Sequence, residues 1–297
     1  MTKNANYDVV CIGNYTKDTI VTPAGVEYTD GGAVNYASHA IAGLGLKVAV
    51  VTHLSKEDSR VVDACKDVGI DCYPTFTEYS TLMKLEYPTV NPDIRTLTVE
   101  HTAGSIAPSE LVGFNGIKSA VIGTSLRGEV GLDVIKTLKE KQVLLGADVQ
   151  GFVRVLDGVN LGKQPWEEME ETLAYIDILK SDAVEAEFLT GESDIYKAAR
   201  IFAEMGPEEV VLTHKDGLLI LANGQYFEME FYPEQLKGRS GRGDTCLGTY
   251  IAMRLTKPPE EAGIWAAALT SLKMEKQGPF TRTIDDVRDL IDRKYRQ

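Results

Sequence analysis

A glycine-rich turn that runs into an acid is the segment of this chain best suited to chemistry. Its sequence is GRSGRGDTCLGTYIAMRL, residues 238–255, and an apolar-periodic helix follows the glycines directly. Glycine allows close backbone approach, and free N–H groups at a helix start attract anions. Asp244 lies in this anion site, where a carboxylate is either a helix cap or a base for an attacking hydroxyl. Beside a phosphate cradle the second role is favoured, which predicts phosphoryl transfer with Asp244 as general base.

Two better-known anion loops are absent from the sequence. No GK[ST] follows the glycines, so the segment is not a Walker A loop. The first predicted strand leads into GNYTKD instead of GxGxxG, so the dinucleotide fingerprint is also missing. The sequence therefore argues against both a P-loop NTPase and a dinucleotide-dependent oxidoreductase.

Composition narrows the class of protein further. The chain has 297 residues, 43% of them hydrophobic, which is enough for a sizeable core. The formal charge of −13 is spread along the chain without a Lys/Arg cluster, so nucleic acid is not expected as a partner. We find neither a long uninterrupted apolar run nor a signal peptide, and expect a cytoplasmic protein without membrane contact. The cysteines lack CxxC spacing, which argues against a disulfide framework or a zinc site.

Short apolar runs that alternate with helical patterns predict the elements that position this loop. YDVVCIG (7–13) and KVAVVTHL (47–54) flank a helix with small residues on one face, which is a β-α-β start. Further strands are expected at 120–125, 143–149, 177–182 and 209–214. The alternation predicts an α/β fold, a doubly wound and mostly parallel sheet flanked by helices.

Residues 73–103 break this rhythm. They alternate polar and apolar residues around a Pro/Asn turn, as antiparallel strands with one wet face do. Together with residues 15–30 they are expected to form a small β-sheet lid. The lid is interpreted as an insertion, so residues 1–297 make a single domain.

The chain resembles the ribokinase-like, or PfkB, family of carbohydrate and nucleoside kinases over nearly its whole length. Gly13 and Asp18 in GNYTKD match the first substrate-contacting element of the family. Gly31, Gly32 and Asn35 in GGAVNYA match its double-glycine signature. The signature near the C-terminus corresponds here to Gly241, Arg242, Gly243 and Asp244.

The resemblance implies a role for each matched residue. Asp244 is the base, and the N–H groups of Arg242, Gly243 and Asp244 form an anion hole. The substrate hydroxyls are bound by the first two signatures. Glu185 and Asp182, in KSDAVEAEFLTG, correspond to the segment that organises Mg²⁺. The nucleotide site takes Thr213, Gly217 and Gly278.

Some positions depart from the family pattern. Asp182 stands where the family has Asn, and the turn after Thr213 is one residue short. Arg242 replaces a small residue, and its side chain contacts either a phosphate oxygen or solvent. Arg154 reaches either an anionic group or an ion-pair partner. Arg127 is not expected to touch substrate.

The remaining candidates for chemistry are interpreted as structural. His39, His53 and His214 have no partner at metal-ligand spacing and are not expected to bind metal. Cys246 follows the proposed base closely but has no His or Asn partner in the motif, and is assigned to packing.

The function expected from these features is ATP-dependent phosphorylation of a sugar, inositol or nucleoside hydroxyl with Mg²⁺. An unphosphorylated acceptor is favoured because the expected lid offers only Lys84 and Arg95 as cations. A homodimer through the lid would bury its exposed edge. The alternative is a non-catalytic ligand sensor that retains the fold.

Overall fold

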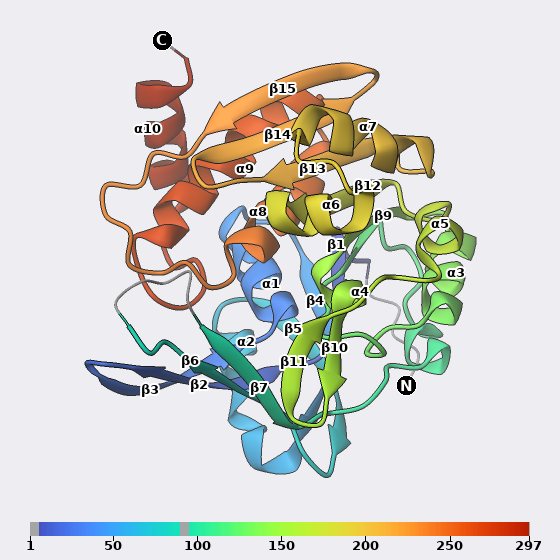
Figure 1. Cartoon of the computed structure of the whole chain (residues 1–297), viewed down its shortest axis with the longest axis vertical. Helices are drawn as coiled ribbons and strands as arrows, with labels where there is room; N and C mark the ends of the chain where they lie inside the picture. The colour runs from blue at the N-terminus through green and yellow to red at the C-terminus, as the bar shows by residue number, and fades with distance from the viewer. Residues whose placement is uncertain (1–5, 90–94, 297) are drawn as a thin grey trace.

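A nine-stranded sheet forms the centre of the molecule in the computed structural model, which describes residues 6–89 and 95–296. The strand order is β15-β14-β13-β12-β9-β8-β1-β4-β5 (Figure 1). All neighbours are parallel except β13 with β14 and β14 with β15. The prediction of a doubly wound, mostly parallel sheet is confirmed. Its strands are β1 (Val9–Ile12), β4 (Val48–Ser55), β5 (Ile70–Thr77), β8 (Ser119–Ile122), β9 (Leu144–Asp148), β12 (Ile178–Asp182), β13 (Glu209–Thr213), β14 (Gly217–Ala222) and β15 (Gln225–Glu230).

Helices cover both faces of this sheet and bury two hydrophobic clusters against it. Parallel strands covered on both faces must be apolar throughout, which explains why the sequence shows continuous apolar runs. One face carries α1 (Ala33–Gly43), α2 (Arg60–Asp67), α8 (Arg242–Arg254), α9 (Pro259–Met274) and α10 (Ile284–Lys294). The other carries α3 (Leu132–Glu140), α4 (Gln150–Val153), α5 (Met169–Leu173), α6 (Ala183–Thr190) and α7 (Ile195–Glu204).

Small residues bring α1 and α8 together at the edge of the site. A Cβ atom on Gly248 of α8 would lie 2.9 Å from Cα of Ala37 on α1, so a larger residue would separate the two helices. This close contact explains the small-faced helix expected between the first two strands.

A second sheet has six strands in the order β10-β11-β7-β6-β2-β3. Figure 1 shows it in the lower half of the view, with β3 at its left end and β10 and β11 at its right end. Only β2 and β6 pair in parallel. Its strands are β2 (Thr16–Thr22), β3 (Gly25–Gly31), β6 (Thr81–Glu86), β7 (Thr96–His101), β10 (Arg154–Asp157) and β11 (Asn160–Lys163).

The composition of this small sheet differs from the expected lid in two places. Residues 73–77 belong to β5, which pairs with β4 in the large sheet. β5 is an edge strand with one wet face, so its alternation resembles that of a lid strand. The hairpin 154–163 was not predicted to join the small sheet, because its strands have only four residues each. The expected Pro/Asn turn falls on residues 90–94, outside the described residues.

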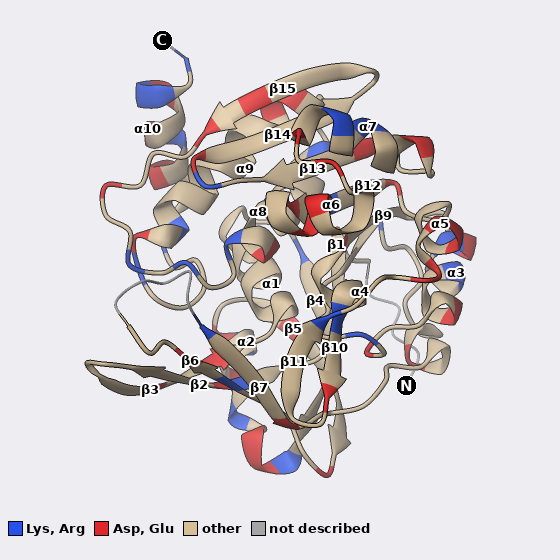
Figure 2. Ribbon diagram, in the orientation of Figure 1, with Lys and Arg blue, Asp and Glu red and all other residues tan. Residues whose placement is uncertain are grey.

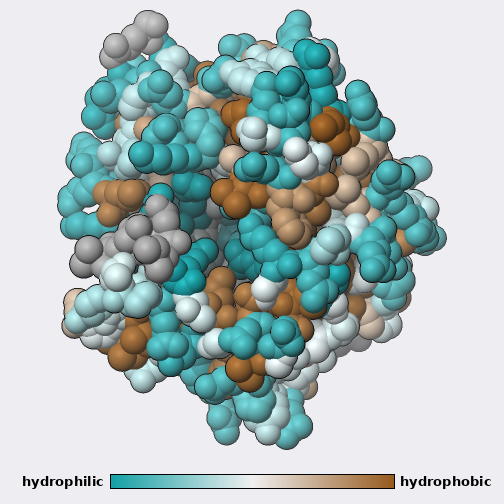
Figure 3. Space-filling view, viewed as in Figure 1, coloured by the Kyte–Doolittle hydropathy of each residue, from teal (hydrophilic) through white to brown (hydrophobic). Residues whose placement is uncertain are grey.

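The two sheets enclose a hollow (Figure 3), around which hydrophilic residues gather on the visible face. The small sheet has its own apolar cluster, Ile20, Met83, Leu85 and Val99. Within residues 6–89 and 95–296, no helix combines the length and apolar character needed to cross a bilayer.

Candidate active site

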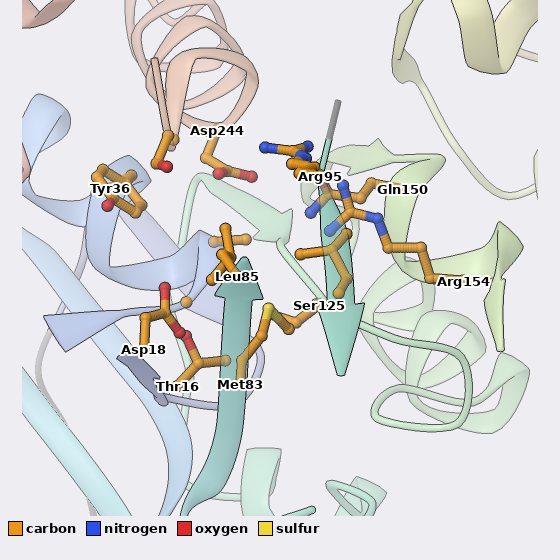
Figure 4. Close-up of a pocket in the computed structure, with 15 residues that line it drawn as sticks. Thr16, Asp18, Tyr36, Met83, Leu85, Arg95, Ser125, Gln150, Arg154 and Asp244 are labelled. Carbon is orange, nitrogen blue, oxygen red and sulfur yellow. The ribbon is translucent and has the colours of Figure 1, made fainter. Parts of the chain in front are cut away.

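Two adjoining pockets lie between the large and small sheets. The inner pocket is bounded by β2, the start of α1, β6 and β7 (Figure 4). The second pocket, called the cationic pocket because lysine and arginine side chains line it, lies beyond the start of α8, toward the carboxyl ends of β12 and β13. Asp244 borders both pockets, together with Arg95, Gln150, Arg154, Ser240 and Gly241. The carboxylate of Asp244 can therefore act on a molecule held in either pocket.

The loop before α8 gives these pockets their anion-binding character. Gly241 is the N-cap residue in the left-handed conformation (φ 73°), and a Cβ there would lie 2.1 Å from the Tyr36 ring. The N–H of Arg242 donates to the carbonyl of Arg239 at 3.3 Å. Within the described chain, the N–H groups of Gly243 and Asp244 have no main-chain partner. The expected three-donor anion hole is thus reduced to these two free donors, because a turn already uses the first.

The carboxylate of Asp244 is not used as a helix cap. Among the described residues it makes no hydrogen bond. Burial raises the pKa of Asp244 above the usual carboxylate range, Lys180, Arg154 and Lys273 lower it, and Glu185 raises it. A carboxylate with free lone pairs and a raised pKa has the properties of a general base.

Behind the loop lies a buried ion pair that sequence reasoning missed. Nζ of Lys180 on β12 is 2.8 Å from Oδ2 of Asp148 at the end of β9, and both side chains are almost fully buried. A Cβ atom on Gly243 would lie 2.3 Å from this Nζ atom. Glycine at position 243 therefore makes room for a fixed ammonium directly beneath the anion loop.

The two carboxylates expected to organise a metal lie side by side at the start of α6. They form a capping box: Oδ1 of Asp182 accepts from the N–H of Glu185 at 2.7 Å. Burial, followed by the charge of Asp182, raises the pKa of Glu185. No group of three or more metal-binding side chains exists in the part of the chain described. Asp182 lines the cationic pocket, whereas Glu185 is buried next to it and lines neither pocket. Mg²⁺ is commonly held by one or two carboxylates with waters and phosphate oxygens, and Asp182 fits that role.

The inner pocket contains part of the expected substrate set. Asp18 and Gly32 line it. Oδ1 of Asp18 is buried without a hydrogen-bond partner among the described residues, which leaves an acceptor for a ligand hydroxyl. A Cβ on Gly31 would lie 2.2 Å from Oδ2 of Asp18, so this glycine makes room for the carboxylate.

Like Gly31, the other two expected substrate residues, Asn35 and Gly13, do not line the inner pocket. Asn35 donates from Nδ2 to the carbonyl of Asp30 at 3.0 Å. A Cβ on Gly13 would lie 1.9 Å from the Gly123 carbonyl oxygen, so Gly13 allows the β1 and β8 ends to approach. Both residues support the pocket wall from behind.

Cations dominate the second pocket. It is lined by seven lysine and arginine residues, namely Arg95, Arg154, Lys163, Lys180, Lys215, Arg239 and Arg242. Figure 2 shows blue segments near the start of α8 and on β10. The expectation that the lid offers only two cations is wrong, because the β10–β11 hairpin adds Arg154 and Lys163.

The structure places the three arginines that the sequence singled out, Arg242, Arg154 and Arg127. Arg242 lines the cationic pocket and lies over the Phe231 ring at 5.9 Å, so its side chain is partly enclosed. Burial lowers the pKa of Arg154, which faces both pockets. Arg127 donates to main-chain carbonyls of Phe152, Gln164 and Pro165, consistent with the structural role expected for it.

The three residues expected to bind the nucleotide, Thr213, Gly217 and Gly278, do not lie together in one pocket. Thr213 lines the cationic pocket, as does His214, which was assigned to structure. Gly217 starts β14, where a Cβ would lie 2.2 Å from the Met229 carbonyl oxygen. Gly278 has a positive φ of 82° in the loop after α9, and neither pocket includes it among the described residues.

Comparisons with known proteins agree with this geometry. The family model of pfkB family carbohydrate kinases matches residues 1–285. A cytidine kinase of Thermococcus kodakarensis is 24% identical over 254 residues, which cover 82% of this chain and 87% of that protein. A pyrophosphate-dependent kinase of the ribokinase family, solved with a pyrophosphate analog and myo-inositol, is 31% identical with a TM-score of 0.87; the match covers 95% of this chain and 99% of the other.

A further solved relative concerns the position of phosphorylation. It is described as the conversion of a pyrophosphate-dependent myo-inositol-1 kinase into a myo-inositol-3 kinase by two substitutions that introduce leucine. It is 31% identical with a TM-score of 0.86, and the match covers 97% of this chain and 99% of that one.

Proposed function

Because the chain belongs to the pfkB family of carbohydrate kinases, we propose that it phosphorylates a hydroxyl of a small polyhydroxylated acceptor with Asp244 as general base. The observation that carries the proposal is the position of Asp244. Its unbonded carboxylate borders both an inner pocket with an orphaned acceptor on Asp18 and a pocket lined by cations. A base at this border takes a proton from one molecule while the other presents its phosphoryl group.

The mechanism assigns a task to each part of the site. Asp18 accepts a hydrogen bond from one acceptor hydroxyl and so orients the ring, and the small sheet excludes water that would compete as acceptor. Asp244 removes the proton of the attacking hydroxyl. The N–H groups of Gly243 and Asp244, with the Lys180 ammonium below them, receive the negative charge of the transferring phosphoryl group.

Asp182, which lines the cationic pocket, would hold Mg²⁺ there, with the buried Glu185 of the same capping box adding its charge from behind. When bound there, the ion would neutralise charge on the donor phosphates. The raised pKa of Glu185 is consistent with a carboxylate that gains stability from a nearby cation.

Pyrophosphate is the donor that the pocket favours, with ATP as the second candidate. Seven cationic side chains suit a short polyanion, whereas the residues expected to hold a nucleoside are divided between separate places. Solved relatives at 31% identity are described as pyrophosphate-dependent. Thr213, which the family pattern places in the nucleotide site, supports ATP because it lines the same pocket.

An inositol is the acceptor class that we place first, ahead of a nucleoside. The inner pocket is lined both by polar residues, Thr16, Asp18, Ser125 and Gln150, and by apolar side chains of β6 and β7, Met83, Leu85 and Leu97. Such a pocket fits a ring with hydroxyls at its edge and C–H groups on its face. A relative solved with myo-inositol supports this class, and a cytidine kinase supports the nucleoside.

Two leucines on the lid side bear on which hydroxyl reacts. Leu85 and Leu97 are direct cross-strand partners on β6 and β7, and both line the inner pocket. In a relative, two substitutions that introduce leucine move phosphorylation of myo-inositol from position 1 to position 3. With myo-inositol as acceptor, position 3 is therefore the proposed target, and L85N/L97S is expected to shift the product toward position 1. Product analysis by NMR and chiral chromatography reads this out, and an unchanged product refutes the assignment to this pair.

The experiment that tests the whole proposal is a turnover assay with Mg²⁺. Pyrophosphate and ATP are each offered with a panel of inositols, sugars and nucleosides. Turnover of one acceptor with pyrophosphate is expected, and turnover only with ATP would replace the proposed donor. If no acceptor turns over while one of them raises the melting temperature, the sensor alternative replaces the kinase.

A further inference from the structure

Lys273 is a buried lysine of α9 that the proposed mechanism does not use. Its side chain lies among the buried residues of this helix, and the residue is 2% exposed. Nζ donates to the carbonyl oxygen of Gly238 at 2.8 Å and to that of Ser240. Among the residues that the structure describes, no carboxylate forms an ion pair with it. A buried ammonium without a direct ion pair needs such neutral ligands to offset its lost hydration.

The segment that supplies these carbonyls is fixed to the end of the same helix. The N–H groups of Lys237 and Gly238 donate to the carbonyl of Met274 at 2.9 and 2.8 Å. A Cβ on Gly238 would lie 2.0 Å from the carbonyl oxygen of Lys276, so a side chain at this position would displace the segment. Both elements are thereby held close enough for Lys273 to bind two carbonyls at once.

An aromatic face completes the surroundings of the ammonium. The centroid of the Tyr36 ring lies 4.9 Å from Nζ of Lys273, and the same ring packs against Gly241 of the anion loop. Main-chain carbonyls and an aromatic face are neutral, electron-rich ligands that also suit a bare monovalent cation. The position beside the anion loop connects this cation to the site.

We propose that Lys273 acts as a tethered monovalent cation, which orients the anion loop and makes catalysis independent of bound K⁺ or Na⁺. By holding the Gly238 and Ser240 carbonyls on one side of the loop, it leaves the N–H groups of Gly243 and Asp244 free for the donor on the other. It is a positioning residue, since neither pocket includes it. This inference rests on the proposed phosphotransfer.

A salt-exchange assay with matched variants tests the inference. Wild type is expected to keep its kcat when K⁺ and Na⁺ are replaced by tetramethylammonium. Lys273→Met is expected to lose about 100-fold in kcat, the scale of one lost charge-stabilising donor. Its acceptor KM stays unchanged, and added NH₄⁺ or K⁺ restores part of the rate. Lys276→Met, an exposed neighbour, is the control and behaves as wild type.

Several outcomes overturn the inference. These are activation of wild type by K⁺, full activity of Lys273→Met, or a loss that no monovalent cation restores. If Lys273→Met does not fold, the wild-type salt exchange still decides, because a cation requirement contradicts the proposal by itself.

Failure of the proposed function is distinguishable from failure of this inference. If wild type turns over no acceptor, the affinity for pyrophosphate, measured by calorimetry, is compared between the variants in place of kcat. Lys273→Met should then bind pyrophosphate more weakly than wild type, with recovery in NH₄⁺. Equal binding by both proteins refutes the tethered cation.

Discussion

Asp244 is the residue on which the proposed chemistry depends. Asp244→Asn keeps the shape of the side chain but removes the base, so kcat should fall by about 10³-fold. Binding of donor and acceptor should persist, because neither pocket loses a wall. Steady-state kinetics and calorimetry measure the two effects separately.

An acid at the same position of another helix provides the control for this variant. Asp286 lies at the third position of α10 and accepts from the N–H and hydroxyl of Thr283 in a capping box. Asp286→Asn should lower the melting temperature and leave kcat unchanged. A comparable loss of kcat in both variants would show that Asp244 acts only on the fold.

Asp18 gives the acceptor site a pH dependence. Burial raises the pKa of Asp18 to about 6, while Thr16 lowers it through a hydrogen bond. Below about pH 6 the protonated group accepts hydroxyl hydrogens poorly, so the acceptor KM should rise as the pH falls. In Asp18→Asn the KM should be high at every pH, and a pH profile of KM for both proteins checks this.

The same group sets a stability prediction of defined sign. A carboxyl whose pKa is raised on folding stabilises the native state at low pH, and this contribution is lost as the pH rises through about 6. Ionised Asp18 therefore costs up to about 3 kcal/mol at neutral pH. Asp18→Asn should raise the melting temperature at neutral pH but not at pH 4.

Asp8 is the contrasting control, because Lys118 lowers its pKa through a hydrogen bond. Asp8→Asn should lower the melting temperature at neutral pH. A fall for Asp18→Asn as well would contradict the assigned direction of its pKa.

At the scale of elements, the anion loop works because β12 and α9 support it from two sides. Lys180 lies beneath Gly243, and Lys273 binds the carbonyls that precede Gly241. Residues from a strand and a helix far apart in the sequence thus hold one turn in a single conformation. This arrangement provides the preorganisation on which electrostatic catalysis depends.

Gly243→Ala tests this support directly. The new Cβ atom would lie 2.3 Å from Nζ of Lys180 and force the ammonium away from Asp148. We expect kcat to fall about 10-fold to 100-fold with a small change in melting temperature. Gly162→Ala is the control, since no atom lies within 4 Å of its added Cβ. Equal kinetics of the two variants would refute the role of the Lys180 contact.

At the scale of the whole molecule, the outer edge of β3 in the small sheet pairs with no other strand of the described chain. β3 ends the sheet order, and its Val26 and Tyr28 are 53% and 78% exposed. An exposed apolar edge is a template for pairing with another copy. The homodimer through the lid stays a prediction, and light scattering after gel filtration measures it.

Charge on this edge should abolish the dimer. Val26→Lys combined with Tyr28→Glu is expected to give a monomer, while Val112→Lys, at another exposed valine (70%), keeps the dimer. A wild-type monomer, or a dimer that survives the double substitution, would show that β3 is not the interface.

The sequence by itself determined six of the nine strands of the large sheet, β1, β4, β8, β9, β12 and β13, and the place of Asp244 after a glycine-rich turn. Both are local properties: continuous apolar runs satisfy strands buried on two faces, and glycines before a periodic helix define an anion-binding turn. The positions of Asp182 and Thr213 at the site could also be predicted from the sequence. Each residue ends a strand, and the carboxyl ends of parallel strands meet at one edge of the sheet.

Only the tertiary structure decided which strands join which sheet and which cations surround the loop. Alternation in residues 73–77 does not tell an edge strand from a lid strand, because both have one wet face. No motif of the sequence assigned a role to Lys180 or Lys273. Their roles depend on partners distant in the sequence, Asp148 for one and the Gly238 and Ser240 carbonyls for the other. Long-range packing creates those contacts, and no local pattern encodes them.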